Sequence, residues 1–200
     1  SKRTNGEFYL GVCGPVRTGK STFIKKFMEM FVLPGIRDEN DRKRAMDELP
    51  QSAEGKTIMT TEPKFIPKEA VKINLFDGND IKVRMVDCVG YIVEDAGGLM
   101  EGERERIVMT PCSEEPMTFA KAAEYGTKKV IHDHSTIGIV ITTDGSFGDI
   151  SRQSYKAAED KTISELKSIG KPFIVIVNSA NPFGEKAKDV INEIKEKIYH

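Results

Sequence analysis

Residues 14–21 read GPVRTGKS and match the pattern GxxxxGK[ST] in full. The glycines of such a loop let several backbone N–H groups point at one centre, and the helix that follows directs its positive dipole end to the same place. Lys20 would reach the β and γ phosphates of a nucleotide, and the Ser21 hydroxyl would bind Mg²⁺. The alternative is a glycine-rich turn that merely precedes a helix. The pattern predicts a phosphate site formed by Gly14, Pro15, Val16, Arg17, Thr18, Gly19, Lys20, Ser21 and Thr22.

A second acidic group for the metal is present in VRMVDCVG, residues 83–90. Asp87 ends a hydrophobic, strand-like run, and Gly90 completes a DxxG arrangement. Asp87 would hold Mg²⁺ through water, while the Gly90 N–H would bond the γ phosphate and report its loss. A strand-terminal Asp often only forms a turn. The phosphate loop upstream favours the metal role here.

Between these motifs lies EGKTIMTTEPKF, residues 54–65, with three closely spaced threonines. A threonine in a switch loop can give its hydroxyl to Mg²⁺ and its backbone N–H to the γ phosphate. Thr60 and Thr61 are the candidates for this sensor, with Thr57 third, and the sequence does not separate them. An ordinary β-prone edge would also explain the threonines. Lys20, Thr60, Thr61 and Asp87 are the predicted catalytic group, and Ser21, Thr60 and Asp87 are the predicted metal ligands.

The residue after DxxG is Tyr91, where related nucleotide switches place a glutamine that orients water. A phenol cannot replace the carboxamide in that role. Candidate charge stabilisers exist, but each is more typical of a solvated surface: Arg17, Arg104, Arg106 and Arg152. We therefore expect slow turnover, on the order of 10⁻⁴ to 10⁻² s⁻¹.

The stretch VNSANP, residues 177–182, stands where guanine-specific switches carry Asn-Lys-x-Asp. The missing Asp carboxylate would accept hydrogen bonds from guanine, whereas Asn181 offers one acceptor and two donors and suits adenine. Asn178 and Asn181 are accordingly predicted to contact the base, and Ser179 replaces the Lys that would cover it. An Asn-Pro pair that only starts a turn is the alternative for Asn181. Loss of the guanine reader is the firmer half of this interpretation.

Composition sets the outer limits of function. The 200 residues are 38% hydrophobic, which suits one α/β domain, and the formal net charge of -1 gives no reason to expect nucleic acid as a partner. The three cysteines indicate a reduced, cytosolic compartment, and neither a membrane-spanning run nor a signal-peptide core is visible. Cys88 is expected to be a buried filler. His132 and His134 lack a third ligand at useful spacing, so loop or capping roles are expected.

Strand-like and helical patterns alternate along the chain. Strands are expected at 8–13, 80–90, 135–144 and 172–178, with those at 80–90 and 172–178 buried, and an edge strand or strand pair at 63–76. Helices are expected at 20–32, 152–170 and 184–199, with a short helix within 38–49. The segments 35–61 and 88–134 are expected to be mobile and switch-like, the latter because its periodicity is weak. The prediction is one P-loop NTPase domain over 1–200, with a mostly parallel sheet, helices on both faces and GTPase-like topology.

The stretches YLGVCGPVRTGKSTFIKKFME, EGKTIMTTEPKFIP, VRMVDCVGY, DHSTIGIVITTDGS and GKPFIVIVNSANP together resemble one family closely. They are similar to the amino-terminal nucleotide-binding domain of the stage IV sporulation protein A family, which are ATPases of the spore-coat basement layer. The resemblance implies a fold related to translation-factor GTPases that uses ATP and Mg²⁺. It assigns Lys20 and Ser21 to the phosphate loop, Asp87 to the metal side and Thr60 and Thr61 to the sensor.

The resemblance also implies roles beyond the nucleotide site. Hydrolysis would permit self-assembly into a static polymer on the outer forespore membrane, in the mother-cell cytosol. A small amphipathic membrane-bound peptide and other coat proteins would be partners, through regions of the longer family proteins outside this chain. A GTP-dependent switch, or a scaffold that retains an inactive nucleotide pocket, are the alternatives.

Overall fold

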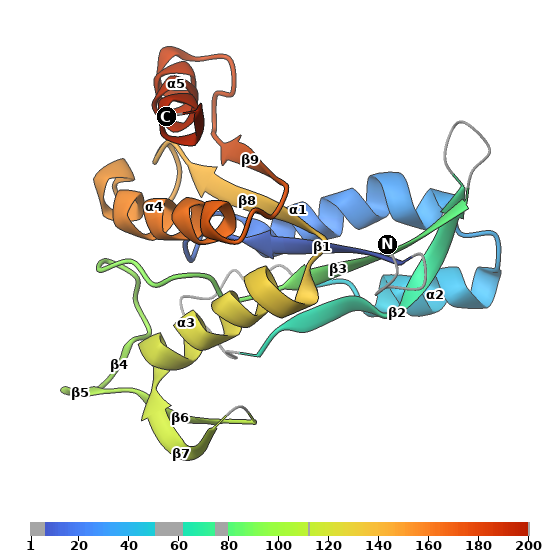
Figure 1. Ribbon diagram of the computed structural model, residues 1–200, viewed down its shortest axis with the longest axis horizontal. Coiled ribbons are helices and arrows are strands. Elements are labelled where there is room, and N and C mark those ends of the chain that lie inside the picture. Colours follow the sequence, from blue (N-terminus) through green and yellow to red (C-terminus); the bar gives the residue numbers. More distant parts are fainter. Residues whose placement is uncertain (1–6, 51–61, 75–79, 112, 200) are drawn as a thin grey trace.

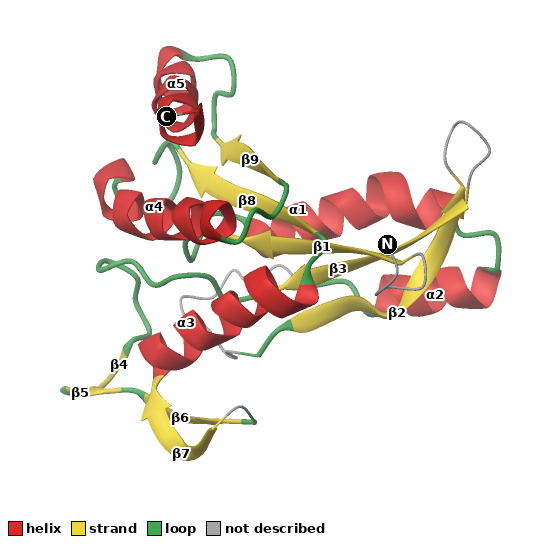
Figure 2. Ribbon diagram, viewed as in Figure 1, coloured by secondary structure: helices red, strands yellow, loops and turns green. Residues whose placement is uncertain are grey.

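The structure is a computed structural model, and it describes residues 7–50, 62–74, 80–111 and 113–199. Its elements, drawn in Figures 1 and 2, follow in chain order. They are β1 (Glu7–Cys13), α1 (Lys20–Phe27), the π-helical η1 (Met28–Val32), the 3-10 turn η2 (Leu33–Gly35), α2 (Glu39–Asp47), β2 (Lys64–Asn74), β3 (Asp80–Asp87), β4 (Met100–Glu101), β5 (Arg104–Glu105), β6 (Ile107–Thr110), β7 (Ser113–Thr118), α3 (Phe119–Lys129), the π-helical η3 (Val130–His134), β8 (Ile137–Thr143), α4 (Arg152–Ser168), β9 (Phe173–Asn178) and α5 (Glu185–Tyr199).

Five of the strands form one sheet in the order β2-β3-β1-β8-β9. Strand β1 runs parallel to both β3 and β8, and β9 runs parallel to β8, whereas β2 is antiparallel to β3. Strand β2 is thus a single edge strand and not a strand pair. The sheet confirms the predicted α/β class with mostly parallel strands. Because parallel strands end at the same edge, the loops that follow β1, β3, β8 and β9 meet there.

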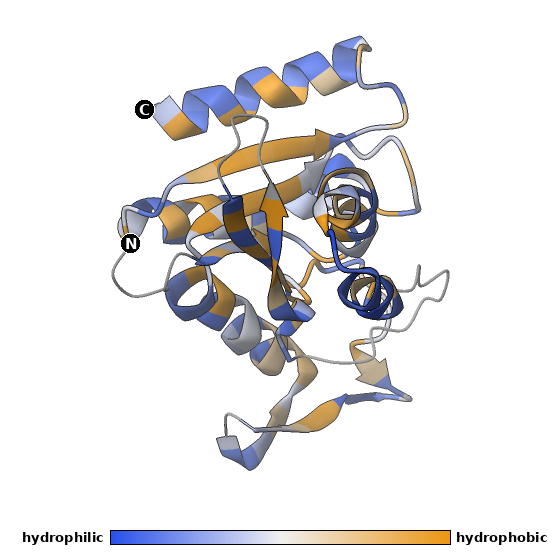
Figure 3. Cartoon of the chain, turned by 90° about the vertical axis from the view of Figure 1, so that its right-hand side faces the viewer, coloured by the Kyte–Doolittle hydropathy of each residue, from blue (hydrophilic) through white to orange (hydrophobic). Residues whose placement is uncertain are grey.

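Helices cover both faces of this sheet, as the sequence predicts. On one face Ile24, Met28 and Val32 of α1 and η1 pack against Val12 and Met85. On the other face η3 and α4 contribute to a second core, and α5 packs beside α4 through a smaller apolar cluster. Figure 1 shows α3 and α1 on opposite sides of the sheet, and in Figure 3 hydrophobic residues concentrate in the strands while α2 is largely hydrophilic.

Side-chain caps fix where several helices begin. The Asp38 carboxylate accepts a hydrogen bond from the Asp41 N–H at the start of α2, inside the segment where a short helix is predicted. Thr118 and Ser151 cap α3 and α4 in the same way. Together α1 and η1 span residues 20–32, which are the predicted bounds of the first helix. Among the described residues, no helix is both long and apolar enough to cross a membrane.

One segment has more regular structure than its sequence indicated, and one expectation about burial is wrong. Residues 91–134, in which the sequence predicts no regular element, contain the hairpins β4–β5 and β6–β7 as well as the helix α3. The 172–178 run does form a strand, but β9 lies at the edge of the sheet and is not buried, since 54% of Ile174 is exposed. An apolar run shows that a strand is favoured. Its position within the sheet depends on which strands pair with it.

Candidate nucleotide site

The predicted phosphate loop connects the end of β1 to the first residue of α1. Gly14 and Gly19 have φ angles of +124° and +94°, a region that side chains rarely adopt. A Cβ on Gly14 would lie 2.3 Å from the Ile141 carbonyl oxygen, and one on Gly19 would lie 2.5 Å from Asn178 Nδ2. The loop therefore has its tight shape because both positions are glycine.

Lys20 is only 5% exposed and lies inside this loop. Its ammonium donates a 2.6 Å hydrogen bond to the Pro15 carbonyl, which also accepts from the Thr18 hydroxyl at 3.0 Å. Burial lowers the pKa of Lys20, and the nearby Asp87 carboxylate opposes that shift. A phosphate oxygen carries negative charge and would be a stronger acceptor than the neutral carbonyl. The loop thus holds a buried cation next to the position that a phosphate would occupy.

Ser21 and Asp87 meet at the same edge of the sheet. The Ser21 hydroxyl donates a 2.9 Å hydrogen bond to Asp87 Oδ2, and Asp87 Oδ1 is buried without a hydrogen-bond partner among the described residues. Burial raises the pKa of Asp87, and the charge of Lys20 opposes this effect. A hydroxyl and a carboxylate with a spare buried oxygen are the hard ligands that Mg²⁺ prefers. These two residues fit the predicted magnesium site.

The DxxG turn lies directly on the phosphate loop. The Val16 N–H donates to the Tyr91 carbonyl at 2.9 Å, and the Tyr91 N–H donates to the Gly14 carbonyl at 3.2 Å. Gly90 has a φ of +97°, and a Cβ there would lie 2.1 Å from the Gly14 oxygen and 2.7 Å from Lys20 Nζ. The structure thus brings the turn beside the buried lysine. The phenol ring of Tyr91 is buried in the core, so it does not face the lysine as a water-orienting group.

The two predicted base contacts separate in the structure. Asn178 Nδ2 donates a 3.1 Å hydrogen bond to the Thr18 carbonyl, so this side chain braces the phosphate loop. Asn181 lies farther along, exposed, with its backbone N–H bonded to Ser179 Oγ at 3.0 Å. The Asn181 side-chain amide lies beside Gly184, in the turn before α5.

Asp144, at the end of β8, is a residue of this edge that the sequence reasoning missed. Its carboxylate accepts hydrogen bonds from the Ser179 hydroxyl at 2.6 Å and from the Ser146 N–H at 2.9 Å, and these hydrogen bonds lower its pKa although burial raises it. It joins the loops that follow β8 and β9. A signal existed in the sequence, because Asp144 ends a hydrophobic strand as Asp87 does.

The remaining threonine and arginine candidates lie in different surroundings. Thr57, Thr60 and Thr61 lie outside the described residues. Arg104 is exposed, the Arg106 guanidinium lies 4.8 Å from the Phe119 ring centroid, and Arg17 Nη2 lies beside Gly97.

Arg152 is a correction, because the sequence indicated a solvated residue and its side chain is 15% exposed. It forms a two-pronged ion pair with the fully buried Glu159 at 2.7 and 2.9 Å. The buried carboxylate needs this partner, and the guanidinium is therefore held against α4.

The described histidines and cysteines take part in packing and hydrogen bonding. His132 is in hydrogen-bond contact with Glu165 at 2.7 Å, and both His132 and His134 end η3. The described part of the chain contains no cluster of side chains that could hold a metal ion in the manner of a histidine or cysteine site. Cys13 and Cys88 are free and buried, and burial raises the pKa of the Cys88 thiol to about 11. Both are therefore unreactive packing residues in this environment.

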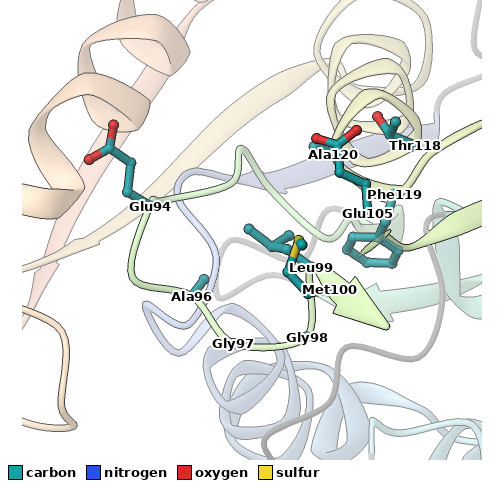
Figure 4. A pocket seen from close by; sticks show the side chains of 10 residues that line it. All are labelled: Glu94, Ala96, Gly97, Gly98, Leu99, Met100, Glu105, Thr118, Phe119 and Ala120. Carbon is teal, nitrogen blue, oxygen red and sulfur yellow. The ribbon is translucent and has the colours of Figure 1, made fainter. Parts of the chain in front are cut away.

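A separate cavity of about 420 Å³ lies between the loop that precedes β4 and the start of α3. Leu99, Met100 and Phe119 line it together with Thr118 and Glu105, as Figure 4 shows. None of the predicted nucleotide-binding residues is among its lining residues. It is distinct from the phosphate loop.

The loop that joins β1 to α1, and the half-buried Asp87 at the end of the neighbouring parallel strand β3, define a nucleotide-binding domain of the P-loop NTPase class. The chain belongs to the family described as "Stage IV sporulation protein A, ATPase domain", whose model matches residues 1–200. This confirms the resemblance seen in the sequence.

Proteins named Stage IV sporulation protein A from three bacteria are similar to this chain. It is 56% identical to that of Bacillus subtilis (strain 168), 58% to that of Clostridioides difficile (strain 630) and 53% to that of Bacillus anthracis, each over 197 residues. The matches cover 98% of this chain and 40% of each relative. The chain therefore spans well under half the length of these relatives.

Proposed function

We propose that this domain binds ATP with Mg²⁺ and hydrolyses it slowly to ADP and phosphate. The observation that carries the proposal is the Ser21–Asp87 pair, with its unpartnered buried carboxylate oxygen, next to the buried ammonium of Lys20. Family membership supports ATP as the nucleotide, since the family is described by an ATPase domain.

Each residue of the site has a defined task in this proposal. Lys20 moves its hydrogen bond from the Pro15 carbonyl to phosphate oxygens, while the backbone N–H groups of the loop hold the remaining oxygens. Ser21 and Asp87 hold Mg²⁺, which neutralises charge on the β and γ phosphates when bound. Thr60 and Thr61 are proposed to order around the γ phosphate, so their replacement by Ala would spare binding and suppress hydrolysis.

Phosphate release tests the enzyme proposal. Lys20→Ala should abolish release, because it removes the cation that faces the phosphates. Lys26→Ala is a matched control on the same helix, since the Lys26 ammonium is exposed and pairs only with Glu29 in the described structure. Equal release from wild type and Lys20→Ala would show that this site does not hydrolyse ATP.

Competition tests the base. Excess GTP should fail to displace labelled ATP, because the position predicted to read guanine carries Asn181 in place of a carboxylate. Displacement by GTP at the same concentration as unlabelled ATP would favour the GTP-dependent switch. Binding of either nucleotide without phosphate release would favour a scaffold.

We further propose that in the longer family proteins hydrolysis permits self-assembly of the spore-coat basement layer at the forespore surface, on the mother-cell side. Contacts with a small amphipathic membrane-bound peptide and with other coat proteins would lie outside this chain. The match of this chain to 40% of the length of each relative supports this proposal, since these relatives are named for a sporulation stage. Sedimentation of the full-length protein tests it: ATP should produce pelletable polymer, and Lys20→Ala should stay in the supernatant. Equal pelleting would contradict the link to hydrolysis.

A further inference from the structure

Two main-chain hydrogen bonds fasten the DxxG turn to the phosphate loop. They run from the Val16 N–H to the Tyr91 carbonyl and from the Tyr91 N–H to the Gly14 carbonyl, so that Pro15 and Tyr91 form an isolated parallel bridge outside the sheet. The parallel pairing of β1 with β3 ends at Val12 and Asp87, so the bridge lies beyond the end of that pairing. This bridge is an added link at the nucleotide site.

The side chain of Tyr91 anchors that bridge to the hydrophobic core. It is 3% exposed and packs in the same core cluster as Cys13, Val16 and Cys88. Lys161 Nζ, on α4, lies 4.8 Å from the ring centroid, a cation–π distance. The hydroxyl is buried without a hydrogen-bond partner in the described structure. The ring, and not the hydroxyl, therefore supplies the anchoring contacts.

The DxxG turn packs closely against the phosphate loop at Gly90. A Cβ on Gly90 would collide with the Gly14 carbonyl and with Lys20 Nζ, so the turn packs directly on the loop and on the buried ammonium. Movement of the turn would require breaking both main-chain bonds or withdrawing the ring from the core. The sequence predicts that the Gly90 N–H bonds the γ phosphate and reports its loss, and this packing favours a turn that stays in place when it does so.

We propose that Tyr91 is a positioning residue for ATP hydrolysis: its buried ring clamps the DxxG turn onto the phosphate loop and keeps the turn beside Lys20 in every nucleotide state. The proposal rests on the proposed ATPase function. Tyr91 occupies the position at which related switches carry a water-orienting glutamine. Its task here is to preset the geometry of the site. Phosphate-dependent movement is then left to other segments.

Amide hydrogen exchange tests the clamp directly, and needs no turnover. The Val16 and Tyr91 amides should be protected in the wild type without nucleotide, with ADP and with a non-hydrolysable ATP analogue. Tyr91→Ala should lose that protection, and Tyr91→Phe should keep it, because the hydroxyl has no partner. Leu166→Ala is the matched control, since Leu166 is fully buried in the same core cluster on α4 and its side chain lies beside Gly138 of β8.

Kinetics test the positioning role. Tyr91→Ala should lower kcat about 10- to 100-fold with KM and ADP affinity little changed, because a misplaced site loses rate more than binding. Tyr91→Phe should restore the wild-type kcat, and Leu166→Ala should lower the melting temperature but keep kcat. If Tyr91→Ala does not fold, Tyr91→Leu should show a smaller loss in the same direction.

Three results would overturn the proposal: retained protection of Val16 in Tyr91→Ala, an equal loss of kcat in Leu166→Ala, or a loss in Tyr91→Phe as large as in Tyr91→Ala. Failure of the ATPase function gives a different pattern. In that case the wild type releases no more phosphate than Lys20→Ala, while the amide protection still reports whether the clamp exists.

Discussion

The Ser21 hydroxyl donates a 2.9 Å hydrogen bond to Asp87 Oδ2, although the two residues are 66 positions apart in sequence. The register of the sheet makes this contact possible, because Val12 of β1 pairs with Asp87 of β3 and both strands point to the same edge. Ser21 then lies at the start of α1, directly after the loop that leaves β1. The contact therefore depends on the parallel pairing of β1 with β3.

Replacing either partner should weaken Mg²⁺ binding more than nucleotide binding. Ser21→Ala removes a proposed ligand, and Asp87→Asn removes the negative charge while it keeps the size of the side chain and an oxygen that can accept from Ser21. Loss of a group that acts on the metal through water costs about 10- to 100-fold in metal affinity or activity. Titration of phosphate release with Mg²⁺ measures the effect. An unchanged Mg²⁺ midpoint in Asp87→Asn would show that the metal lies elsewhere.

The Asp87 carboxyl, one oxygen of which is buried, should make stability depend on pH. Burial raises its pKa in the folded protein, although Lys20 opposes the shift, so the folded protein binds this proton more tightly than the unfolded chain does. The stability that this group contributes is therefore full at low pH and is lost as pH rises through the folded pKa. An Asn at this position does not titrate.

Melting temperatures of the nucleotide-free and magnesium-free protein check this sign. The melting temperature of Asp87→Asn relative to the wild type should rise between pH of about 4, near the pKa of Asp in an unfolded chain, and neutral pH. A relative melting temperature that stays constant or falls over this range would mean that the carboxyl is not destabilised by burial.

Asn178→Ala should weaken ATP and GTP binding equally. The lost contact is the hydrogen bond from Asn178 Nδ2 to the Thr18 carbonyl, which holds the phosphate loop and does not involve the base. One hydrogen bond contributes about 1 kcal/mol, so affinity for each nucleotide should fall about fivefold. Equilibrium binding with labelled nucleotides measures this. A loss confined to one nucleotide would assign base reading to Asn178, and Asn181→Ala provides the comparison, since a change of preference is expected there if Asn181 reads adenine.

The sheet and the centre of the site could be predicted because their signals are local. The 20–32 helix follows from apolar residues at helical spacing, and the phosphate loop follows from a pattern that few other structures require. Asp87 stands out because a polar residue ends a hydrophobic run. These residues meet because parallel strands end together, which the alternation of strands and helices already implies.

The parts that were missed depend on packing that the sequence does not state. The buried face of α3 carries one large apolar residue, Phe119, and otherwise small residues, Ala122, Ala123, Gly126 and Thr127, so few bulky apolar side chains mark this helix in the sequence. The edge position of β9 depends on strand pairing. The Tyr91 ring and the Asn178 amide have roles set by which neighbour they reach, the α4 lysine and the Thr18 carbonyl. Residue type alone does not give either neighbour.

The ion pair between Arg152 and Glu159 should be a main determinant of stability. Glu159 is fully buried, and it accepts hydrogen bonds from Arg152 and from the Thr142 hydroxyl at 2.6 Å, with Lys197 Nζ at 3.4 Å. Arg152→Ala leaves a buried carboxylate with weaker compensation, which typically costs about 3–5 kcal/mol. Arg44→Ala is the matched control, because the pairs of Arg44 with Asp41 and Glu69 are exposed and should contribute below about 1 kcal/mol. Urea unfolding measures both, and a similar small loss in the two variants would show that Arg152 does not stabilise the fold through Glu159.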